Sequence, residues 1–172
     1  MLYKQVDIVL LVIPMEDMVK KIRVAAEARQ SKDFLIIART DARTTLGLDE
    51  ALRRAEAYAK AGADILFVES PETEEEMRTI GRTFHQPLLA NMVEKGRTPV
   101  LTKAELEALN FKLAIFPITA MLASVQAMLQ VYKQFKSTGS SVGGTTDLYD
   151  FTDLTKLMGF EEVWDFDKKH AD

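Results

Sequence analysis

The sequence contains no cysteine and lacks the features that mark nucleic-acid-binding and membrane-spanning proteins. Without cysteine, disulfides, thiolate nucleophiles and cysteine-ligated metals are excluded. The chain has 26 acidic and 22 basic residues, a net charge of −4, and no dense Lys/Arg stripe, which argues against nucleic acid. Its longest apolar run, residues 6–13, contains Asp7 and ends at Pro14, well short of the roughly 18 residues of a membrane span. We therefore expect a cytoplasmic protein that binds neither nucleic acid nor membrane.

Short apolar runs alternate with longer amphipathic stretches along the chain. The apolar runs are too short for helices and resemble parallel strands covered on both faces; they are residues 34–38, 64–69, 86–91 and 112–117. Helical patterns lie between and after them, at residues 15–30, 49–61, 121–135, 150–158 and 161–170. Two further helices are expected to open with capping boxes, at Thr73–Glu76 and Thr102–Glu105.

Four strands that alternate with helices indicate a parallel sheet with right-handed crossovers, and hence an α/β fold. An open doubly wound sheet and part of a (β/α)8 barrel both fit this pattern. A complete barrel takes about 250 residues, and the chain supplies about half the strands. A Gly- and Ser-rich stretch is the clearest break. We expect a body at residues 1–136, a linker at 137–149 and a helical segment at 150–172.

Polar side chains follow the apolar runs where the carboxyl ends of parallel strands meet, the edge at which such proteins bind ligands. Arg39 suits a planar anion, because its guanidinium pairs with two oxygens of a carboxylate or phosphonate. Asn91 suits the same anion or an enolate oxygen, and Glu69 suits proton transfer or orientation of a neighbour. Structural alternatives stay open: Arg39 pairs only with Asp41 or Glu69, Asp41 caps a helix, and Asn91 satisfies loop backbone groups.

Five motifs in register resemble the isocitrate lyase and phosphoenolpyruvate mutase superfamily: IIARTDAR, GLDEAL, AGADILFVESPE, LLANMVEKGRTP and FKLAIFP. The resemblance runs from Pro14 to about Trp164. The chain most resembles the branch that contains 2,3-dimethylmalate lyase, oxaloacetate hydrolase and carboxyphosphonoenolpyruvate phosphonomutase. The second strongest resemblance is to 2-methylisocitrate lyase. The family resemblance implies a partial TIM (β/α)8 barrel, about the last four strand–helix units, with C-terminal helices exchanged between subunits.

The resemblance also implies a chemistry: cleavage of a C–C bond of a 2-oxo acid or dicarboxylate through an enolate stabilised by Mg²⁺. It implies Glu69 as a catalytic residue, a position at which phosphonate-specific relatives tend to have histidine. The substrate-binding positions that it implies are Arg39, Asn91, Gly96, Thr98 and Pro117.

One departure from the family pattern shapes the functional expectation. Family members carry their metal-binding acids and a gating loop upstream of the ARTD motif, and residues 1–13 do not resemble that loop. We therefore expect a truncated, catalytically incomplete chain without metal ligands of its own, which does not bind Mg²⁺ strongly alone. Its expected partners are a small 2-oxo acid or dicarboxylate and further copies of the chain, held through residues 150–172. The alternatives are a non-catalytic half-barrel assembly module and a phosphonomutase-type enzyme acting on a P–C bond.

Overall fold

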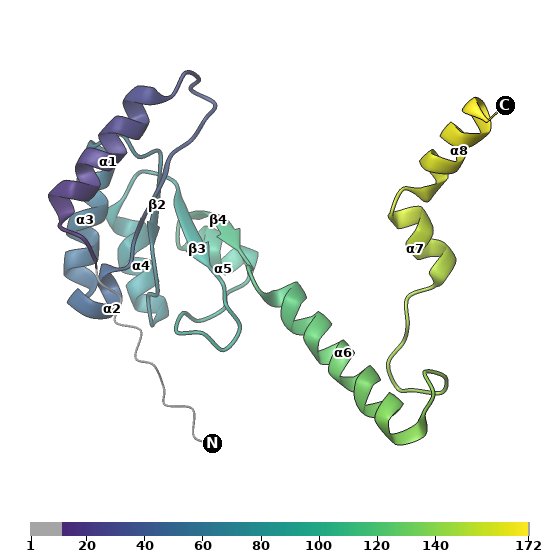
Figure 1. Cartoon of the computed structure of the whole chain (residues 1–172). Helices are drawn as coiled ribbons and strands as arrows, with labels where there is room; N and C mark the ends of the chain where they lie inside the picture. The colour runs from purple at the N-terminus through teal and green to yellow at the C-terminus, as the bar shows by residue number, and fades with distance from the viewer. Residues whose placement is uncertain (1–11, 172) are drawn as a thin grey trace. The chain divides into compact units, whose positions relative to one another are not determined.

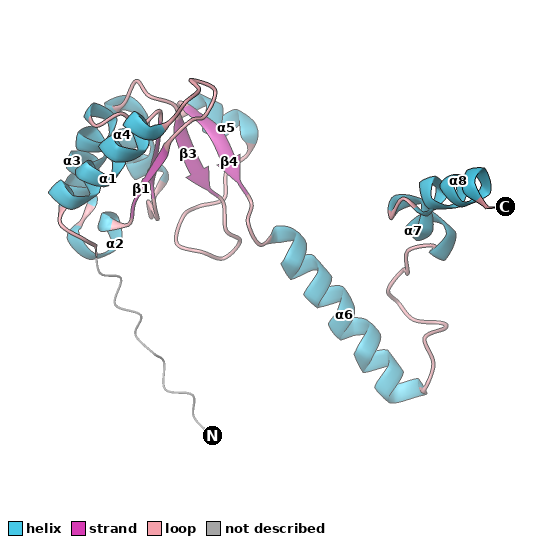
Figure 2. Ribbon diagram, turned by 45° about the horizontal axis from the view of Figure 1, so that its top comes forward, coloured by secondary structure: helices cyan, strands magenta, loops and turns pink. Residues whose placement is uncertain are grey.

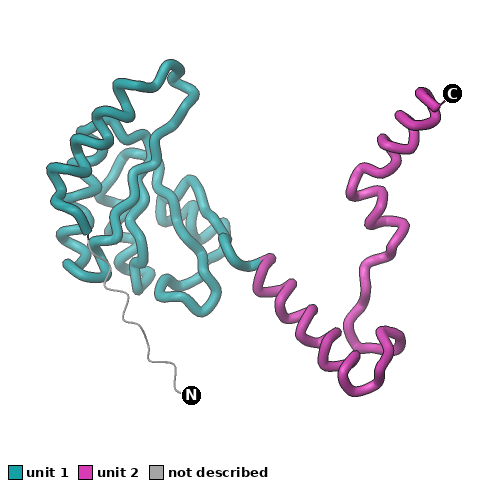
Figure 3. Tube along the Cα trace, in the orientation of Figure 1, with its two compact units in different colours: residues 1–119 teal, residues 120–172 magenta. Residues whose placement is uncertain are grey.

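The computed structural model describes residues 12–171, and the chain divides into two compact units, residues 1–119 and 120–172 (Figure 3). The predicted body, 1–136, extends to a position inside α6, beyond the division at residue 119. The elements of the first unit, in chain order, are α1 (Met15–Ala28), β1 (Ile37–Thr40), α2 (Ala42–Leu46), α3 (Leu48–Lys60), β2 (Ile65–Val68), α4 (Glu74–Thr83), β3 (Leu88–Asn91), α5 (Lys103–Ala108) and β4 (Phe111–Ile115) (Figure 1). After it come α6 (Thr119–Thr138), α7 (Phe151–Leu157) and α8 (Phe160–His170).

The four strands form one parallel sheet in the order β1-β2-β3-β4, so the predicted α/β class is confirmed. The first strand begins later than predicted, at Ile37 rather than Phe34. Pairing with β2 starts where the carbonyl of Ile36 accepts the N–H groups of Asp64 and Ile65. Before that point Phe34 turns back, its N–H donating to the carbonyl of Ser31, and its side chain is exposed. The start of β1 was predicted three residues too early because the prediction used apolar composition alone.

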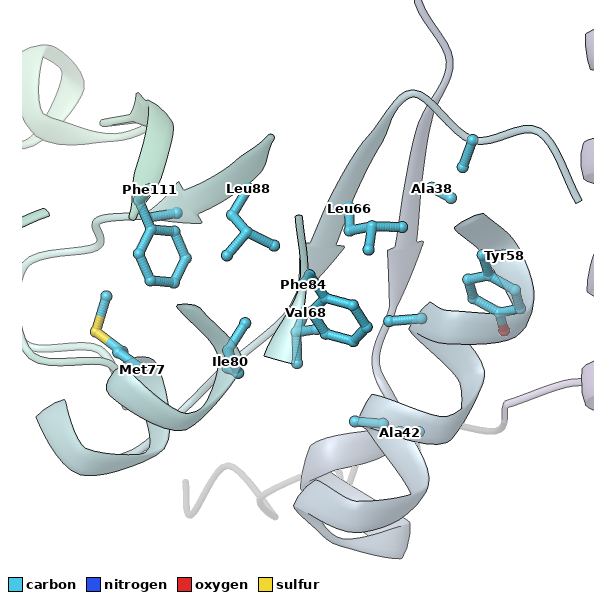
Figure 4. Close-up of a cluster of buried hydrophobic side chains, with 14 of the residues drawn as sticks. Ala38, Ala42, Tyr58, Leu66, Val68, Met77, Ile80, Phe84, Leu88 and Phe111 are labelled. Atoms are coloured by element: carbon cyan, nitrogen blue, oxygen red, sulfur yellow. The ribbon is translucent and has the colours of Figure 1, made fainter. Parts of the chain in front are cut away.

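Helices cover one face of the sheet, and most of the core lies between these helices and that face (Figures 2 and 4). Because side chains alternate along a strand, every second residue of β1–β3 packs into this core: Ala38, Leu66, Val68, Leu88 and Ala90. They meet residues of α1, α3, α4 and α5, among them Ile22, Tyr58, Met77, Ile80 and Leu106.

The opposite face carries only a small cluster of Ile65, Phe67 and Leu89. The prediction that the strands are buried on both faces holds for β2 and β3, apart from the half-buried Asn91, and is wrong for the edge strands β1 and β4. Ile37 at one edge and Ile115 at the other are 46% and 39% exposed. Their side chains point to the face without helices, where residues of the two central strands shield only each other.

One of the two predicted capping boxes is complete. Thr102 and Glu105 exchange side-chain-to-backbone hydrogen bonds at the start of α5. At α4 the Thr73 hydroxyl accepts the N–H of Glu76. The Glu76 carboxylate instead accepts the N–H of Glu72 and pairs with Arg43, so the predicted second half of this box is absent. A tertiary ion pair has displaced the local hydrogen bond.

Asp64 fastens the start of β1 to the end of α1. Its Oδ2 accepts from Arg29 Nη1 at 2.6 Å and from the N–H of Ile36 at 2.8 Å. These donors hold the pKa of Asp64 below its ordinary value, the backbone N–H of Ile36 contributing most. A carboxyl whose folded pKa is depressed stabilises the fold above its unfolded pKa of about 3.9, and this stabilisation is lost as pH falls through the folded value.

Replacing Asp64 by asparagine is therefore expected to lower the free energy of unfolding at pH 7 by about 1.5–3 kcal/mol, the usual contribution of a hydrogen bond to a charged group. Urea denaturation would show a lower midpoint with an unchanged slope, and the difference from wild type would shrink below about pH 4. Asp17→Asn is the control, because Asp17 pairs with Lys20 through exposed side chains and such pairs are worth about 0–1 kcal/mol. Equal effects of the two substitutions would contradict the role of Asp64.

The helices after β4 have no buried residue. Their sequence is nevertheless rich in large apolar side chains, including Phe151, Leu157 and Phe166, which are 76%, 72% and 63% exposed. Asp150 caps α7 by accepting the N–H of Asp153 at 3.0 Å. Among residues 12–171, no helix combines the length and the apolarity needed to cross a bilayer.

Candidate functional site

Three of the predicted site residues meet at the carboxyl edge of the sheet. Arg39 lies in β1, Glu69 directly follows β2, and Asn91 ends β3. Arg39 Nη1 is 3.5 Å from Glu69 Oε2, and Asn91 Nδ2 is 3.4 Å from each carboxylate oxygen of Glu69. The prediction that these three side chains lie close together is confirmed, and it follows from the parallel order β1-β2-β3.

Arg39 is held from two sides. Its Nε and Nη2 donate to the two oxygens of Asp41 at 3.0 and 2.7 Å. Its guanidinium carbon lies 5.0 Å from the ring centroid of Phe67, within range of a cation–π interaction. The hydrogen bonds to Asp41 and the charge of Glu69 raise the pKa of Arg39 above its ordinary value, against the effect of burial. Arg39 is therefore a permanent cation with a fixed orientation.

The Arg39 guanidinium has five N–H groups, of which two bond to Asp41. Among the described residues, the other three make no hydrogen bond, although one edge faces Glu69. The side chain is 46% exposed. Both structural alternatives for Arg39 are realised, since it pairs with Asp41 and with Glu69, and N–H groups remain for an added anion. Asp41 occupies the N-cap position of α2 without a side-chain cap bond, because its carboxylate is on Arg39.

Glu69 and Asn91 are more enclosed than Arg39. The Glu69 side chain is 16% exposed and accepts from the Ser70 hydroxyl at 3.2 Å. The Asn91 Oδ1 atom is buried and has no hydrogen-bond partner in the part of the chain that the structure describes. Buried acceptors are almost always paired in proteins, so this atom marks a place for a donor from outside residues 12–171.

The remaining predicted residues lie on loops of the same edge. Thr98 borders a small depression together with Asn91 and Ser70. Gly96 closes a turn by donating its N–H to the carbonyl of Val93 at 2.9 Å, and Pro117 is exposed just after β4. Within residues 12–171, neither Gly96 nor Pro117 makes a hydrogen bond to Arg39, Glu69 or Asn91.

Sequence reasoning missed Glu94, in the loop after β3. Its Oε1 accepts from the Thr119 hydroxyl, which holds the pKa of Glu94 below its ordinary value. Its Oε2 is buried without a partner among the described residues. Only the polar character of Glu94 next to the LAN motif signals it in the sequence, because the contact depends on where the chain turns after β4.

A pocket of about 520 Å³ lies beside Arg39, Thr40 and Asp41 at the open edge of β1, with Arg54 and Tyr58 in its wall. Arg54 donates to Glu50 at 2.7 Å and to the carbonyl of Ile13 at 2.8 Å. Arg39 therefore borders a cavity on this side, which the sequence did not predict.

A magnesium site was expected for the family but not for this chain alone. Within residues 12–171, no three His, Cys, Asp or Glu side chains are placed to hold a metal ion. The two carboxylates at the site, Asp41 and Glu69, both pair with the Arg39 guanidinium, so a cation is already beside each of them. These residues do not fit Mg²⁺, and we assign no metal ligand among them.

The chain is similar in sequence and in structure to known proteins. Residues 8–136 match the family described as phosphoenolpyruvate phosphomutase. The chain is 44% identical over 160 residues to 2,3-dimethylmalate lyase from Eubacterium barkeri. The matched region covers 93% of this chain and 55% of that protein. The chain superposes on oxaloacetate acetylhydrolase in complex with its product oxalate (TM-score 0.84, 27% identity, 94% and 56% coverage). It also superposes on phosphonopyruvate hydrolase in complex with oxalate and Mg²⁺ (TM-score 0.82, 28% identity, 94% and 58% coverage).

Proposed function

Because this chain belongs to the phosphoenolpyruvate phosphomutase family, within the isocitrate lyase and phosphoenolpyruvate mutase superfamily, we propose that it binds a carboxylate of a small 2-oxo acid or dicarboxylate through Arg39. Its fold is a partial (β/α)8 barrel, as predicted. The chain spans about half the length of the relatives it matches, 55% of 2,3-dimethylmalate lyase. The activity of the whole relatives, cleavage of a C–C bond, is thus a proposal for this chain.

The observation that carries the proposal is the cluster of Arg39, Glu69 and Asn91 at the carboxyl edge. Arg39 has N–H groups left to bind two oxygens of a planar carboxylate, which orients the substrate as well as attracting it. Asn91 adds an amide beside it. Glu69 lies between Arg39 and Asn91, and its carboxylate is mostly enclosed. We therefore assign Glu69 the role of transferring a proton or of orienting the bound acid.

The charge balance of the site limits how tightly this chain binds an anion. Asp41 and Glu69 carry two negative charges against the single positive charge of Arg39. We expect oxalate to bind with a Kd on the order of 1 mM, which corresponds to about 4 kcal/mol. Equilibrium dialysis with labelled oxalate would measure this value. Failure to bind at about 50 mM, some fifty times the expected Kd, would refute the proposed function.

The purified chain is expected to bind Mg²⁺ only weakly and to turn over neither 2,3-dimethylmalate nor oxaloacetate. Mg²⁺ needs carboxylates in near-octahedral geometry, and residues 12–171 hold no such group of three ligands. A coupled assay for pyruvate or oxalate release, run with and without EDTA, tests this expectation. Product formation that EDTA abolishes would show that the chain builds a metal site of its own and would overturn the assignment of an incomplete site.

A further inference from the structure

A second arginine near the site, Arg43 on α2, binds two carboxylates at once. Its Nε and Nη2 donate to Glu76 at 3.0 and 2.7 Å, and its Nη1 is 2.6 Å from Glu72 Oε1. The Arg43 and Glu76 side chains are 17% and 21% exposed. The paired carboxylate of Glu76 raises the pKa of Arg43, and Arg43 lowers that of Glu76. This group therefore stays ionised across the ordinary pH range.

These contacts join the segment after β1 to the turn after β2. Glu72 lies in that turn, which also contains Ser70 and leads into α4. Glu76 accepts the backbone N–H of Glu72 at 2.7 Å through the same Oε2 that faces Arg43. Arg43 thus fixes the turn twice, by a direct ion pair to Glu72 and by holding the carboxylate that binds its backbone.

The turn needs fixing because its first residue has an unfavourable backbone conformation. Ser70 has a φ of 59°, in the left-handed region, which costs a residue other than glycine free energy that the surroundings must supply. In this conformation the Ser70 hydroxyl donates to Glu69 Oε1 at 3.2 Å. The same carboxylate faces Arg39 and Asn91. The direction of the Glu69 carboxylate therefore depends on the turn that Arg43 holds.

We propose that Arg43 is a positioning residue: through Glu72 and Glu76 it holds the turn at residues 70–73 and so aims the Glu69 carboxylate at Arg39 and Asn91. Arg43 touches none of these three side chains by a hydrogen bond in the described part of the chain, and it acts through the turn. The expected effect of Arg43 on ligand binding rests on the proposed function. The expected effect of Arg43 on the position of the Glu69 carboxylate does not depend on that function.

The matched control is Arg78, on α4. It pairs with Glu74 at 2.6 Å and with Glu75 at 3.4 Å, so it also joins two carboxylates. Its side chain is 36% exposed and its partners lie on its own helix. Arg78→Met removes an ion pair of the same kind without releasing the turn, and separates loss of charge from loss of position.

The test compares Arg43→Lys, Arg43→Met and Arg78→Met with wild type by three measurements. These are the melting temperature, the Kd for oxalate and the ¹³Cδ resonance of Glu69 in labelled protein. Arg43→Lys keeps the charge but loses the planar fork, so it should remain folded. We expect both Arg43 variants to shift the Glu69 resonance and to weaken oxalate binding about five- to tenfold, and Arg78→Met to do neither.

The outcomes separate the two hypotheses. If folded Arg43→Lys and Arg43→Met leave the Glu69 resonance and the oxalate Kd at wild-type values, or Arg78→Met changes them equally, Arg43 is not a positioning residue. If wild type binds no oxalate, the proposed function fails, and the Glu69 resonance alone decides the role of Arg43. If Arg43→Met does not fold, Arg43→Lys gives the decision. A non-additive effect of Arg43→Lys and Glu76→Gln in the double variant would support the proposal further.

Discussion

Replacing Arg39 by glutamine is expected to weaken oxalate binding by at least about tenfold, the largest effect of any single substitution at the site. Arg39 is the one cation of the cluster with Glu69 and Asn91, and it has N–H groups free for an anion among the described residues. A hydrogen bond to a charged group is worth about 1.5–3 kcal/mol, or roughly 10- to 150-fold in Kd. Glutamine also leaves the negative charge of Asp41 and Glu69 unopposed.

Two further variants separate the effects of charge and of guanidinium geometry on oxalate affinity. Arg39→Lys keeps the charge without the fork, and should bind oxalate more weakly than wild type but better than Arg39→Gln. Asp41→Asn removes a negative charge and one of the two oxygens that accept from Nε and Nη2 of Arg39, and should bind oxalate several-fold more tightly. Equilibrium dialysis on all four proteins is the measurement. Equal affinity of wild type and folded Arg39→Gln would contradict the assignment of Arg39.

Removing residues 150–172 is expected to convert an oligomer into a monomer. This segment contains α7 and α8 and has eight large apolar side chains at least 42% exposed: Phe151, Leu154, Leu157, Met158, Phe160, Val163, Trp164 and Phe166. Apolar side chains exposed in this number on a short segment indicate an interaction site. Burying each such side chain contributes about 1.5–3 kcal/mol, enough to hold an interface after ordering costs. We infer that the segment packs on another copy of the chain, in line with the predicted exchange of C-terminal helices.

Light scattering on the full chain and on the chain ending at Tyr149 would decide this prediction. We expect a dimer or larger assembly for the full chain and a monomer for the shorter one. Trp164→Ser is a milder companion, since Trp164 lies beside Phe160 with the two rings tilted and their centroids 6.0 Å apart. This variant should raise the dissociation constant without changing helix content. A full chain that is monomeric, and stays so after the deletion, would show that the segment covers its own chain instead.

The elements that the sequence predicts well are those that depend on local pattern and strand order. The runs at 64–69 and 86–91 contain β2 and β3, because both central strands are apolar on both faces. The grouping of Arg39, Glu69 and Asn91 follows once the strands are parallel and in sequence order, since each residue ends or directly follows a strand. The family resemblance, carried by motifs at these same positions, agrees with the matches found.

The features that the sequence does not predict depend on distant contacts. Glu76 reads as a capping-box residue but pairs with Arg43, 33 residues away. Phe34 reads as part of a strand, although the backbone pairs with β2 only from Ile36 onward. In each case a tertiary ion pair or sheet register overrides a local preference.

The most direct test of the central claim is an NMR titration of ¹⁵N-labelled chain with oxalate, which maps where a dicarboxylate binds. The account predicts concentration-dependent shifts confined to the carboxyl edge of the sheet: the amides of residues 39–41, 69–70 and 91–98, with a common Kd on the order of 1 mM. In Arg39→Gln all of these shifts should need at least about tenfold more oxalate. Shifts centred elsewhere, such as on α7 and α8, or no shift at saturating oxalate, would contradict the claim that this edge is a substrate-carboxylate site.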